Sequence, residues 1–432
     1  MATIKLVYLG GAATRGPGTV AAFVRHAQHF AGSEIVLVDL NPERLALVER
    51  LGRRLIAEAG VDLRLTSTLD RTAALDGASA VLAAFRPGGF EARVFDECIP
   101  IQHGLIGQET QGPGGFFMAL RSIAVLKDVT AEMERLCPTA WLINYTNPIN
   151  IVGEAITHHS PIRTISLCEG PIIFPAQAAR TVGLDPRQLD AVMIGLNHTG
   201  WSVRHDYNGQ SVIPLLQAAY DRVMADPAIS RASQRMIELA CLMETLPSEY
   251  FQYYYYQAEV LAQMQAAPKT RAQTILEKVP SFWEHYREQA ESAHPKLDPA
   301  LSRGGLLELE LAVEVLAAIV DDLNRVFPCN VRNGGALPTF PADRVVEAPC
   351  LVNRHGATPL SQPPLPRAVA GLVEMLGEYQ ALAAEAAWTG GRADGIRALA
   401  SNPLVLDLRK ARTVYDELAA AHRAYLPERL LR

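Results

Sequence analysis

The sequence predicts an α/β protein, with a Rossmann-like doubly wound sheet in residues 1–196 and a mainly helical α+β lobe in residues 197–432. Two observations predict this fold. In the first half, short apolar runs alternate with helical stretches, as in a parallel sheet covered by helices on both faces. After about residue 200, long helical segments follow a hairpin pattern. A chain of 432 residues is long enough for two lobes.

Six apolar runs are expected to form the strands of the first lobe. They are residues 4–9, 35–39, 80–85, 140–145, 163–167 and 191–195. In the second lobe, Asn208 and Gly209 are expected to turn a hairpin between residues 201–207 and 211–214. Residues 306–319 form a nearly continuous apolar run of helix formers, and the Asn-, Gly- and Pro-rich segment 322–344 indicates strand and loop insertions.

The composition is that of an ordinary globular protein and argues against several function classes. Forty basic and 46 acidic side chains leave a formal net charge of −6, which argues against nucleic acid as a partner. The six cysteines form no CxxC pair, so we expect a reducing compartment. The sequence has neither a basic-then-apolar leader nor an apolar run of about 18 residues. We therefore expect a cytoplasmic protein without a membrane partner.

The turn after the first predicted strand is typical of dinucleotide binding. Glycines here let the backbone approach a pyrophosphate at a helix N-terminus, although Ala12 stands where a second glycine is usual. The carboxylate of Asp39, at the end of the second predicted strand, favours NAD over NADP because it accepts ribose hydroxyls and repels a 2′-phosphate. The alternative is a tight turn that binds no nucleotide. The predicted cofactor-binding residues are Gly10, Gly11, Ala12, Ala13, Thr14, Asp39 and Arg44.

A cysteine and a histidine each follow one of the later predicted strands. Cys168 comes after residues 163–167, and His198 comes after residues 191–195. Ligands of an open α/β sheet bind at the carboxyl ends of its strands, so both side chains are expected at one rim. A thiolate and an imidazole can share one divalent ion, and two protein ligands leave positions open for substrate oxygens. The alternatives are a small buried hydrophobe and a structural histidine.

Three further segments are unusual for loops. Residues 104–115 join the carboxylate of Glu109 to a glycine-rich helix start, and residues 144–148 follow the fourth predicted strand. Residues 250–256 place five tyrosines in seven positions. Such a run usually buries its rings and leaves its hydroxyls in water. One of these tyrosines is nevertheless a candidate base.

In their order along the chain, these motifs resemble those of glycoside hydrolase family 4, the NAD- and divalent-metal-dependent glycosidases that do not use the usual pair of carboxylates. The resemblance extends along nearly the whole chain. It depends on the N-terminal turn, on Cys168 and on residues 86–89, 106–115, 144–148, 197–198, 303–305, 330–335 and 345–349. It implies a lactate dehydrogenase-like nucleotide-binding lobe, NAD and Mn²⁺ or another divalent ion as cofactors, and a homodimer or homotetramer.

The resemblance also implies a mechanism without net redox change. In that family, NAD⁺ takes a hydride from C3 of the sugar, and the ketone acidifies the proton on C2. The metal ion holds the C2 and C3 oxygens and stabilises the enediolate while a base removes that proton. The leaving group on C1 is then eliminated, water adds, and the retained NADH reduces C3 again.

The resemblance assigns roles to single residues. Cys168 and His198 match the metal ligands, and Asn147 matches the asparagine that holds the sugar near C2 and C3. Glu109 lies where the family keeps a carboxylate near the metal ion or its water. The metal site and the sugar site are therefore expected to share one crevice.

Other matches concern substrate binding and the base. Arg86 and Arg303 match arginines of the substrate site. We favour Tyr250 as the base, with Tyr254 as its rival. Either phenol would need its pKa lowered by a nearby positive charge or metal ion to act at neutral pH. Glu169, directly after the cysteine, is a candidate acid for the leaving oxygen if its environment keeps it protonated.

The substrate class is less clearly marked. Glu169 differs from the aspartate of 6-phospho-α-glucosidases, the asparagine of 6-phospho-β-glucosidases and the histidine of enzymes for unphosphorylated α-glycosides. Residues 106–110, 144–148 and 250–254 look more like the phosphosugar branch, although Ala13 replaces a common serine. A phosphate needs Arg or backbone N–H partners. The arginine candidates are Arg15, Arg93 and Arg303.

We therefore expect a glycosidase for a phosphorylated small-molecule sugar, a 6-phospho-α- or 6-phospho-β-glucoside. The first alternative is the same mechanism on an unphosphorylated glycoside. The second is an NAD-dependent 2-hydroxy acid dehydrogenase, which would release NADH in proportion to substrate and need no metal ion. A nucleotide-binding sensor is the weakest alternative, because it leaves Cys168, His198 and Asn147 without a role.

Overall fold

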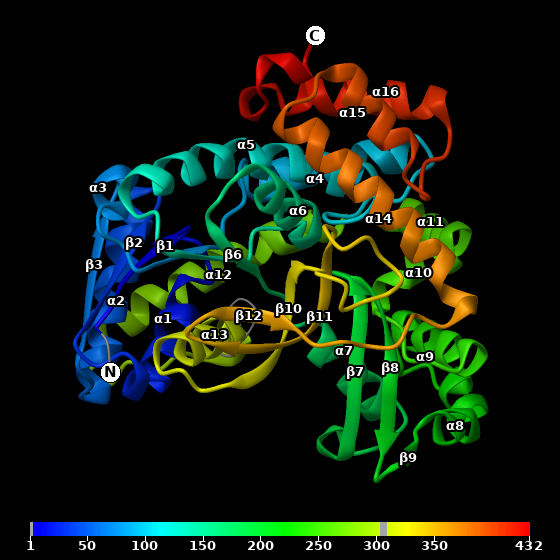
Figure 1. The fold of residues 1–432 in the computed structure, drawn as a ribbon, viewed down its shortest axis with the longest axis horizontal. Coiled ribbons are helices and arrows are strands. Elements are labelled where there is room, and N and C mark those ends of the chain that lie inside the picture. Colours follow the sequence, from blue (N-terminus) through cyan, green and yellow to red (C-terminus); the bar gives the residue numbers. More distant parts are fainter. Residues whose placement is uncertain (1–2, 303–308) are drawn as a thin grey trace.

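The computed structural model describes residues 3–302 and 309–432, and in this part of the chain one twelve-stranded sheet links the two halves (Figure 1). Six parallel strands form its first half in the order β3-β2-β1-β4-β5-β6, which is the order of a doubly wound dinucleotide-binding fold. The predicted fold class is confirmed. The six strands are β1 (Lys5–Leu9), β2 (Ser33–Val38), β3 (Leu63–Thr68), β4 (Ala80–Ala83), β5 (Trp141–Asn144) and β6 (Arg163–Ser166).

The second half of the sheet is antiparallel. It continues from β6 in the order β10-β11-β7-β8-β9, and β12 pairs with β11. The expectation that residues 191–195 continue the parallel sheet was wrong, because β7 is antiparallel to both of its neighbours. The six strands are β7 (Leu189–Leu196), β8 (Thr199–Tyr207), β9 (Gln210–Ser211), β10 (Arg325–Arg332), β11 (Val345–Asn353) and β12 (Gly356–Pro359). The predicted domain boundary at residue 196 thus falls at the turn of the β7–β8 hairpin.

Helices cover both faces of the parallel strands. Alternate residues of β1 face opposite sides: Val7 belongs to an apolar cluster with α5 and α6, and Leu6 to a cluster with α1, α2 and α13. This alternation is what a strand buried on both faces requires. The helices around the parallel strands are α1 (Gly16–Arg25), α2 (Pro42–Ala59), α3 (Arg71–Leu75), α4 (Gly89–Gln102), α5 (Gly112–Leu136), α6 (Ile149–His159) and α13 (Glu310–Val320).

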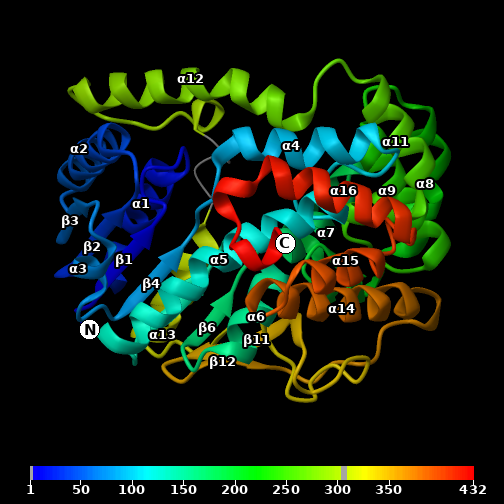
Figure 2. The ribbon, with the colours of Figure 1, turned by 90° about the horizontal axis from the view of Figure 1, so that it is seen from above.

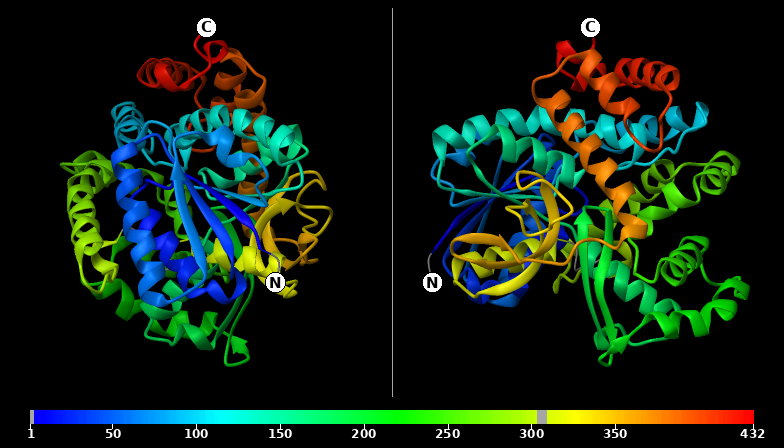
Figure 3. Two further views of the ribbon diagram at one scale, coloured as in Figure 1. Left: turned by 90° about the vertical axis from the view of Figure 1, so that its left-hand side faces the viewer. Right: turned by 45° about the vertical axis from the view of Figure 1, so that its right-hand side comes forward.

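The remaining helices build the second lobe. The C-terminal helices α14, α15 and α16 pack against α5 on one side of the sheet (Figure 3). The bounds are α7 (Gly170–Thr181), α8 (Ile213–Ala225), α9 (Arg231–Met243), α10 (Gln252–Tyr255), α11 (Gln257–Ala266), α12 (Arg271–Glu291), α14 (Arg367–Trp388), α15 (Arg392–Ala400) and α16 (Leu408–Ala421). No helix within residues 3–302 and 309–432 is long and apolar enough to cross a membrane.

Helix α12 connects the second lobe to the first. It lies along α2 and α4 (Figure 2). From this helix, the hydroxyl of Tyr286 donates a 2.7 Å hydrogen bond to the backbone oxygen of Thr14, in the turn after β1. Trp283, one helical turn earlier, lies under the guanidinium of Arg44. A residue 272 positions away in sequence therefore supports the N-terminal turn.

The sequence prediction differs from the structure in two local respects. Strand β3, an edge strand with alternate residues turned to the core, was not predicted. The hairpin's second strand is β9, shorter than the predicted 211–214, because α8 begins at Ile213. The apolar run 306–319 was predicted to be helical, and its described part contains α13, which begins at Glu310. Residues 306–308 lie outside the described residues.

A buried ion pair joins α4 to α5. The Arg121 guanidinium donates to both carboxylate oxygens of Asp96 at 2.8 and 2.6 Å, and both side chains are fully buried. His422, from the segment after α16, places Nε2 2.9 Å from Asp96 Oδ1. Burial raises the pKa of Asp96, but Arg121 and His422 outweigh it and hold that pKa below its ordinary value. The C-terminal segment is therefore tied to the helices beneath it.

Replacing Arg121 with Met is expected to lower the free energy of unfolding by about 3 kcal/mol, because it leaves the Asp96 carboxylate buried and unpaired. Urea denaturation followed by circular dichroism measures this loss. The control is Arg187→Met, which removes an exposed pair with Asp185 and should change the stability by less than about 0.5 kcal/mol. Equal, small losses in both variants would contradict the prediction.

Candidate functional site

The turn after β1 places backbone N–H groups at the start of α1. A side chain on Gly10 would meet the Ala84 backbone oxygen at 2.4 Å, and one on Gly11 would meet Leu37 Cβ at 2.8 Å. Gly10 also has a φ of 97°, which favours glycine. The turn is therefore built from glycine because its backbone packs directly against β2 and the end of β4. Helix α1 begins at Gly16, so the positive end of its dipole lies at the turn, where it favours an anion.

Asp39 links the end of β2 to this turn. Its Oδ2 accepts from the backbone N–H of Ala12 at 3.0 Å, and its Oδ1 accepts from that of Leu40 at 2.7 Å. The carboxylate is thereby fixed beside the turn, as the sequence predicted. Oδ1 also accepts from the backbone N–H of Asn41 at 3.4 Å, so Oδ2 is the oxygen with a second lone-pair direction for a ligand hydroxyl.

The structure brings Cys168 and His198 together. Cys168 follows β6, and His198 occupies the turn between β7 and β8 with a φ of 66°. The distance from Cys168 Sγ to His198 Nε2 is 3.6 Å. Strands β6 and β7 run in opposite directions on either side of β10 and β11, and the strand register places the carboxyl ends of both at the same level of the sheet. The predicted proximity is correct, but the sheet order behind it differs from the prediction.

Burial controls the protonation of both side chains. It lowers the pKa of His198 to about 4, so the imidazole is neutral near pH 7. It raises the pKa of Cys168 to about 12, with Glu347 and Glu169 adding to the rise. The thiol therefore stays protonated unless a strong positive charge lies beside it.

The His198 ring is held on several sides. Tyr250 stacks on it with ring centroids 3.9 Å apart and planes 4° apart. The Thr110 hydroxyl lies 3.0 Å from Nδ1, and the Ser248 hydroxyl donates to the His198 backbone oxygen at 2.6 Å. The ring is fixed before any ligand binds.

A cavity of about 270 Å³ opens beside the pair. Its wall combines one end of β6, the start of α7 and the tyrosine-rich segment. The lining residues are Cys168, Glu169, Gly170, Ile173, Phe174, His198, Glu249, Tyr250, Gln252 and Tyr253. The cavity therefore offers a thiol, an imidazole, carboxylates and a phenol to one ligand of sugar size.

The structure separates the two candidate tyrosines. Tyr250 lines the cavity and stacks on His198. Tyr254 is packed against the main core, and its hydroxyl donates to Gln111 Oε1 at 2.5 Å. Burial holds the pKa of both phenols well above the ordinary value.

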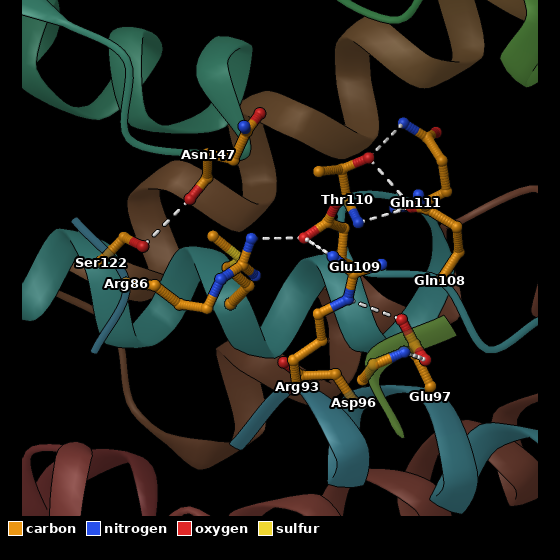
Figure 4. Close-up of polar contacts among 12 residues, drawn as sticks. Arg86, Arg93, Asp96, Glu97, Gln108, Glu109, Thr110, Gln111, Ser122 and Asn147 are labelled. Carbon is orange, nitrogen blue, oxygen red and sulfur yellow. Dashed lines mark hydrogen bonds and ion pairs between the residues drawn. The ribbon is translucent and has the colours of Figure 1, made fainter. Parts of the chain in front are cut away.

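Glu109 is part of an ion-pair cluster next to the site (Figure 4). Its Oε2 pairs with the guanidinium of Arg86 and, at 2.8 Å, with that of Arg93. Arg93 also pairs with Glu97 at 2.6 Å. Burial lowers the pKa of Arg86, and the charge of Glu109 opposes this shift. Glu109 is thus held as a carboxylate between two cations, and its charge also acts on His198 and Tyr250.

Glu169 is hydrogen-bonded on one oxygen. Its Oε1 accepts from the Tyr145 hydroxyl at 2.9 Å and from the Leu309 backbone N–H at 3.2 Å. These two donors orient the carboxyl group of Glu169, which lines the cavity.

Asn147 lies after β5, before α6. Its backbone oxygen accepts from the Ser122 hydroxyl at 3.0 Å (Figure 4), and its side-chain Oδ1 is buried without a hydrogen-bond partner in the described part of the chain. Such an atom needs a partner, so it suits a ligand hydroxyl. Arg303 lies outside the described residues, and Arg15 acts electrostatically on Arg86.

Sequence reasoning missed a group of supporting residues. Glu347 is buried, and its Oε1 accepts from the amides of Asn197 and Asn330, each at 2.9 Å. Burial raises the pKa of Glu347 to about 7, although both amides lower it. Thr110 and Gln108 support His198 from another side. Their sequence signal was only their place in the segments 106–115, 330–335 and 345–349.

Comparisons with known proteins agree with this arrangement. Residues 5–184 match the family described as "Family 4 glycosyl hydrolase", and residues 193–405 match "Family 4 glycosyl hydrolase C-terminal domain". The chain is 34% identical to a "Probable 6-phospho-beta-glucosidase" of Bacillus subtilis (strain 168), covering 98% of both chains. It is 29% identical to a "Maltose-6'-phosphate glucosidase" of the same organism, covering 99% of this chain and 97% of the other.

The fold is shared with solved structures. A 6-phospho-alpha-glucosidase from gut microorganisms, in complex with NAD and Mn²⁺, superimposes with a TM-score of 0.86 at 24% identity, covering 99% of both chains. The whole architecture is therefore common to both proteins, including the antiparallel half of the sheet.

Proposed function

Because the chain belongs to the family 4 glycosyl hydrolases, we propose that it hydrolyses 6-phosphoglucosides, of α or β configuration, with NAD and a divalent ion such as Mn²⁺. The approach of Cys168 Sγ to His198 Nε2, at 3.6 Å on the wall of a cavity, is the observation that carries this proposal. The names of the two relatives reported above, both glucosidases for phosphorylated sugars, support the substrate class.

The residues present fit a catalytic metal ion. Within the described ranges, no group of three or more His, Cys, Asp and Glu side chains is arranged to hold a metal ion, so Cys168 and His198 would act as a pair. Two protein ligands leave positions open for sugar oxygens. A bound cation also supplies the positive charge that a thiol with a pKa of about 12 needs to become a thiolate.

The turn after β1 fits NAD. It combines the N-terminal end of α1, where the helix dipole favours an anion, with the fixed carboxylate of Asp39. Gly10, Gly11, Ala12, Ala13 and Thr14 would approach the pyrophosphate. Arg44, held over Trp283, would lie at the edge of the cofactor site. When bound, NAD supplies a hydride acceptor for C3, and the metal ion supplies a Lewis acid for the sugar oxygens.

Among the tyrosines, the geometry supports Tyr250 as the base. Its ring stacks on His198 and it lines the cavity, so a cation beside His198 would lower the pKa of its phenol. Tyr254 already donates to Gln111 and is packed against the core. Glu169 also lines the cavity and would act on the leaving oxygen, with Tyr145 orienting its carboxyl group.

Sugar recognition would involve Asn147 and the arginine cluster. The unpartnered Oδ1 of Asn147 suits a sugar hydroxyl. Arg86, Arg93 and Arg15 provide the positive charge that a phosphate requires, and Glu109 keeps the first two in place (Figure 4). Arg303 stays a sequence prediction for the same site.

Substrate class is tested with 4-nitrophenyl α- and β-glucosides, each with and without a 6-phosphate. We expect turnover of a phosphorylated compound without net consumption of NAD. We also expect activity to be lost when a chelator removes the metal ion. Turnover of the unphosphorylated compounds alone would contradict the substrate class. NADH accumulating in proportion to substrate, without a metal requirement, would indicate a dehydrogenase instead.

Three expectations remain part of the proposal. A homodimer or homotetramer is expected from the family resemblance. The cytoplasmic location is expected from the sequence. Residues 1–196 are expected to bind NAD, and residues 197–432 are expected to bind the substrate. The positions of the turn after β1 and of the tyrosine-rich segment support this division.

A further inference from the structure

We infer that Thr110 is a positioning residue, whose hydroxyl, oriented by Gln108, fixes the tautomer of His198 that leaves Nε2 free for the metal ion. This inference deepens the proposed function and rests on its metal site. Thr110 lies in the turn before α5, 88 positions from His198 in the sequence. Its side chain is buried.

The side-chain oxygen of Gln108 is identified by its donors. It accepts from the backbone N–H of Thr110 at 2.5 Å and from that of Gln111 at 2.8 Å. A backbone N–H can only donate, so the Gln108 atom at this place must be the oxygen and not the amide nitrogen. Gln108 Oε1 is therefore a fixed acceptor within a turn of the main chain.

The Thr110 hydroxyl has one proton to donate and two lone pairs. It lies 2.9 Å from Gln108 Oε1, which can only accept, so its proton points there. The lone pairs then face His198 Nδ1 at 3.0 Å and the Gln111 side-chain amide nitrogen at 3.5 Å. Figure 4 shows the bonds among Gln108, Thr110 and Gln111. Because the Thr110 hydroxyl donates its only proton to Gln108 Oε1, it can only accept at His198 Nδ1. Nδ1 therefore carries the hydrogen.

A neutral imidazole carries one hydrogen, so Nε2 is left with its lone pair. This lone pair faces Cys168 Sγ at 3.6 Å. In the opposite tautomer, Nε2 would carry the hydrogen and place an N–H at the proposed metal position. The lone pair of Nδ1 would then face a lone pair of the Thr110 hydroxyl oxygen. A hydrogen bond on the remote nitrogen is the usual way a metal-binding histidine is oriented.

The inference predicts a loss of metal affinity in Thr110→Val, which keeps the shape of the side chain and removes the hydroxyl. The wild-type protein and Thr110→Ser should bind Mn²⁺ with similar Kd in isothermal titration calorimetry, and Thr110→Val should bind it about 10- to 100-fold more weakly. NAD affinity should be the same in all three proteins, and all three should remain folded by circular dichroism. A Thr110→Val variant that binds Mn²⁺ as tightly as wild type would overturn the inference.

A second measurement does not need a variant. Two-bond ¹H–¹⁵N spectra of the histidine-labelled, metal-free protein report which ring nitrogen carries hydrogen. The signals of His198 are identified as those that disappear in the His198→Ala variant. For this residue we expect a protonated Nδ1 and an unprotonated Nε2. A protonated Nε2 would overturn the inference while leaving the proposed function in place. Absence of Mn²⁺ binding by the wild type would remove the proposed metal site, and the inference with it.

Discussion

Replacing Cys168 with Ser, or His198 with Ala, is expected to lower kcat/KM for the phosphorylated substrate by roughly 10³-fold or more, a loss of ~4 kcal/mol in transition-state stabilisation. Each change removes one of the two groups, the thiol or the imidazole, that meet at 3.6 Å on the cavity wall. Without both, the proposed ion is no longer held against the sugar. Steady-state kinetics at saturating Mn²⁺ and NAD measure the effect.

Matched controls separate the loss of a ligand from a general effect of substitution. Cys241→Ser changes a partly buried cysteine on α9, and His103→Ala changes a surface histidine that pairs with Glu417. Both controls should keep wild-type kcat/KM. NAD binding, which depends on the turn after β1, should be unchanged in all four variants. Activity within tenfold of wild type in either site variant would remove that residue from the metal site.

Tyr250→Phe is expected to lower the rate of C2 proton exchange with solvent by about 10³-fold, in the range that a positioned general base contributes. The phenol is the cavity-lining hydroxyl whose ring stacks on His198. Its pKa is raised by burial, so it would act as a base only beside the bound cation. Exchange into the substrate in deuterium oxide, followed by NMR, isolates this step from product release.

Tyr254→Phe is the control for this experiment. It removes a hydroxyl that bonds Gln111 at the edge of the core, so exchange should stay within a few-fold of wild type. The reverse result, slow exchange in Tyr254→Phe and normal exchange in Tyr250→Phe, would assign the base to Tyr254. Normal exchange in both variants would mean that neither tyrosine removes the proton.

Local patterns were sufficient for the first lobe. Alternating apolar runs predict five of the six parallel strands, because a strand buried on both faces needs a continuous apolar run. The glycines of the first turn are likewise predictable, since Gly10 lies against Ala84 with no room for a side chain. Strand β3 was not predicted because it is an edge strand whose outer residues are polar.

The order of the remaining strands could not be read locally. Strands β10 and β11 come from residues 325–353 and lie between β6 and β7. No pattern within residues 163–196 indicates that two strands from elsewhere in the chain lie between β6 and β7. The proximity of Cys168 and His198 was predicted from parallel strands, but it arises differently: β6 and β7 run in opposite directions, and the strand register places both of their carboxyl ends at the same level of the sheet.

Side-chain partners were the least predictable part of the site. The family resemblance implied a carboxylate at Glu109 near the proposed metal ion, but not that two arginines hold it. It could not separate Tyr250 from Tyr254, because their directions depend on where the turn Glu249–Phe251 gives way to α10. The roles of Thr110 and Glu347 could not be predicted either, because they depend on hydrogen bonds between residues far apart in the sequence.

The central claim is that Cys168 and His198 jointly bind a divalent cation beside the nicotinamide. A crystal of the protein with Mn²⁺, NAD and a 6-phosphosugar, measured at the manganese absorption edge, tests it directly. The account predicts one anomalous peak bonded to both Cys168 Sγ and His198 Nε2 and facing the sugar. A peak bonded to other residues, or a fully loaded complex with no peak between these two side chains, would contradict it.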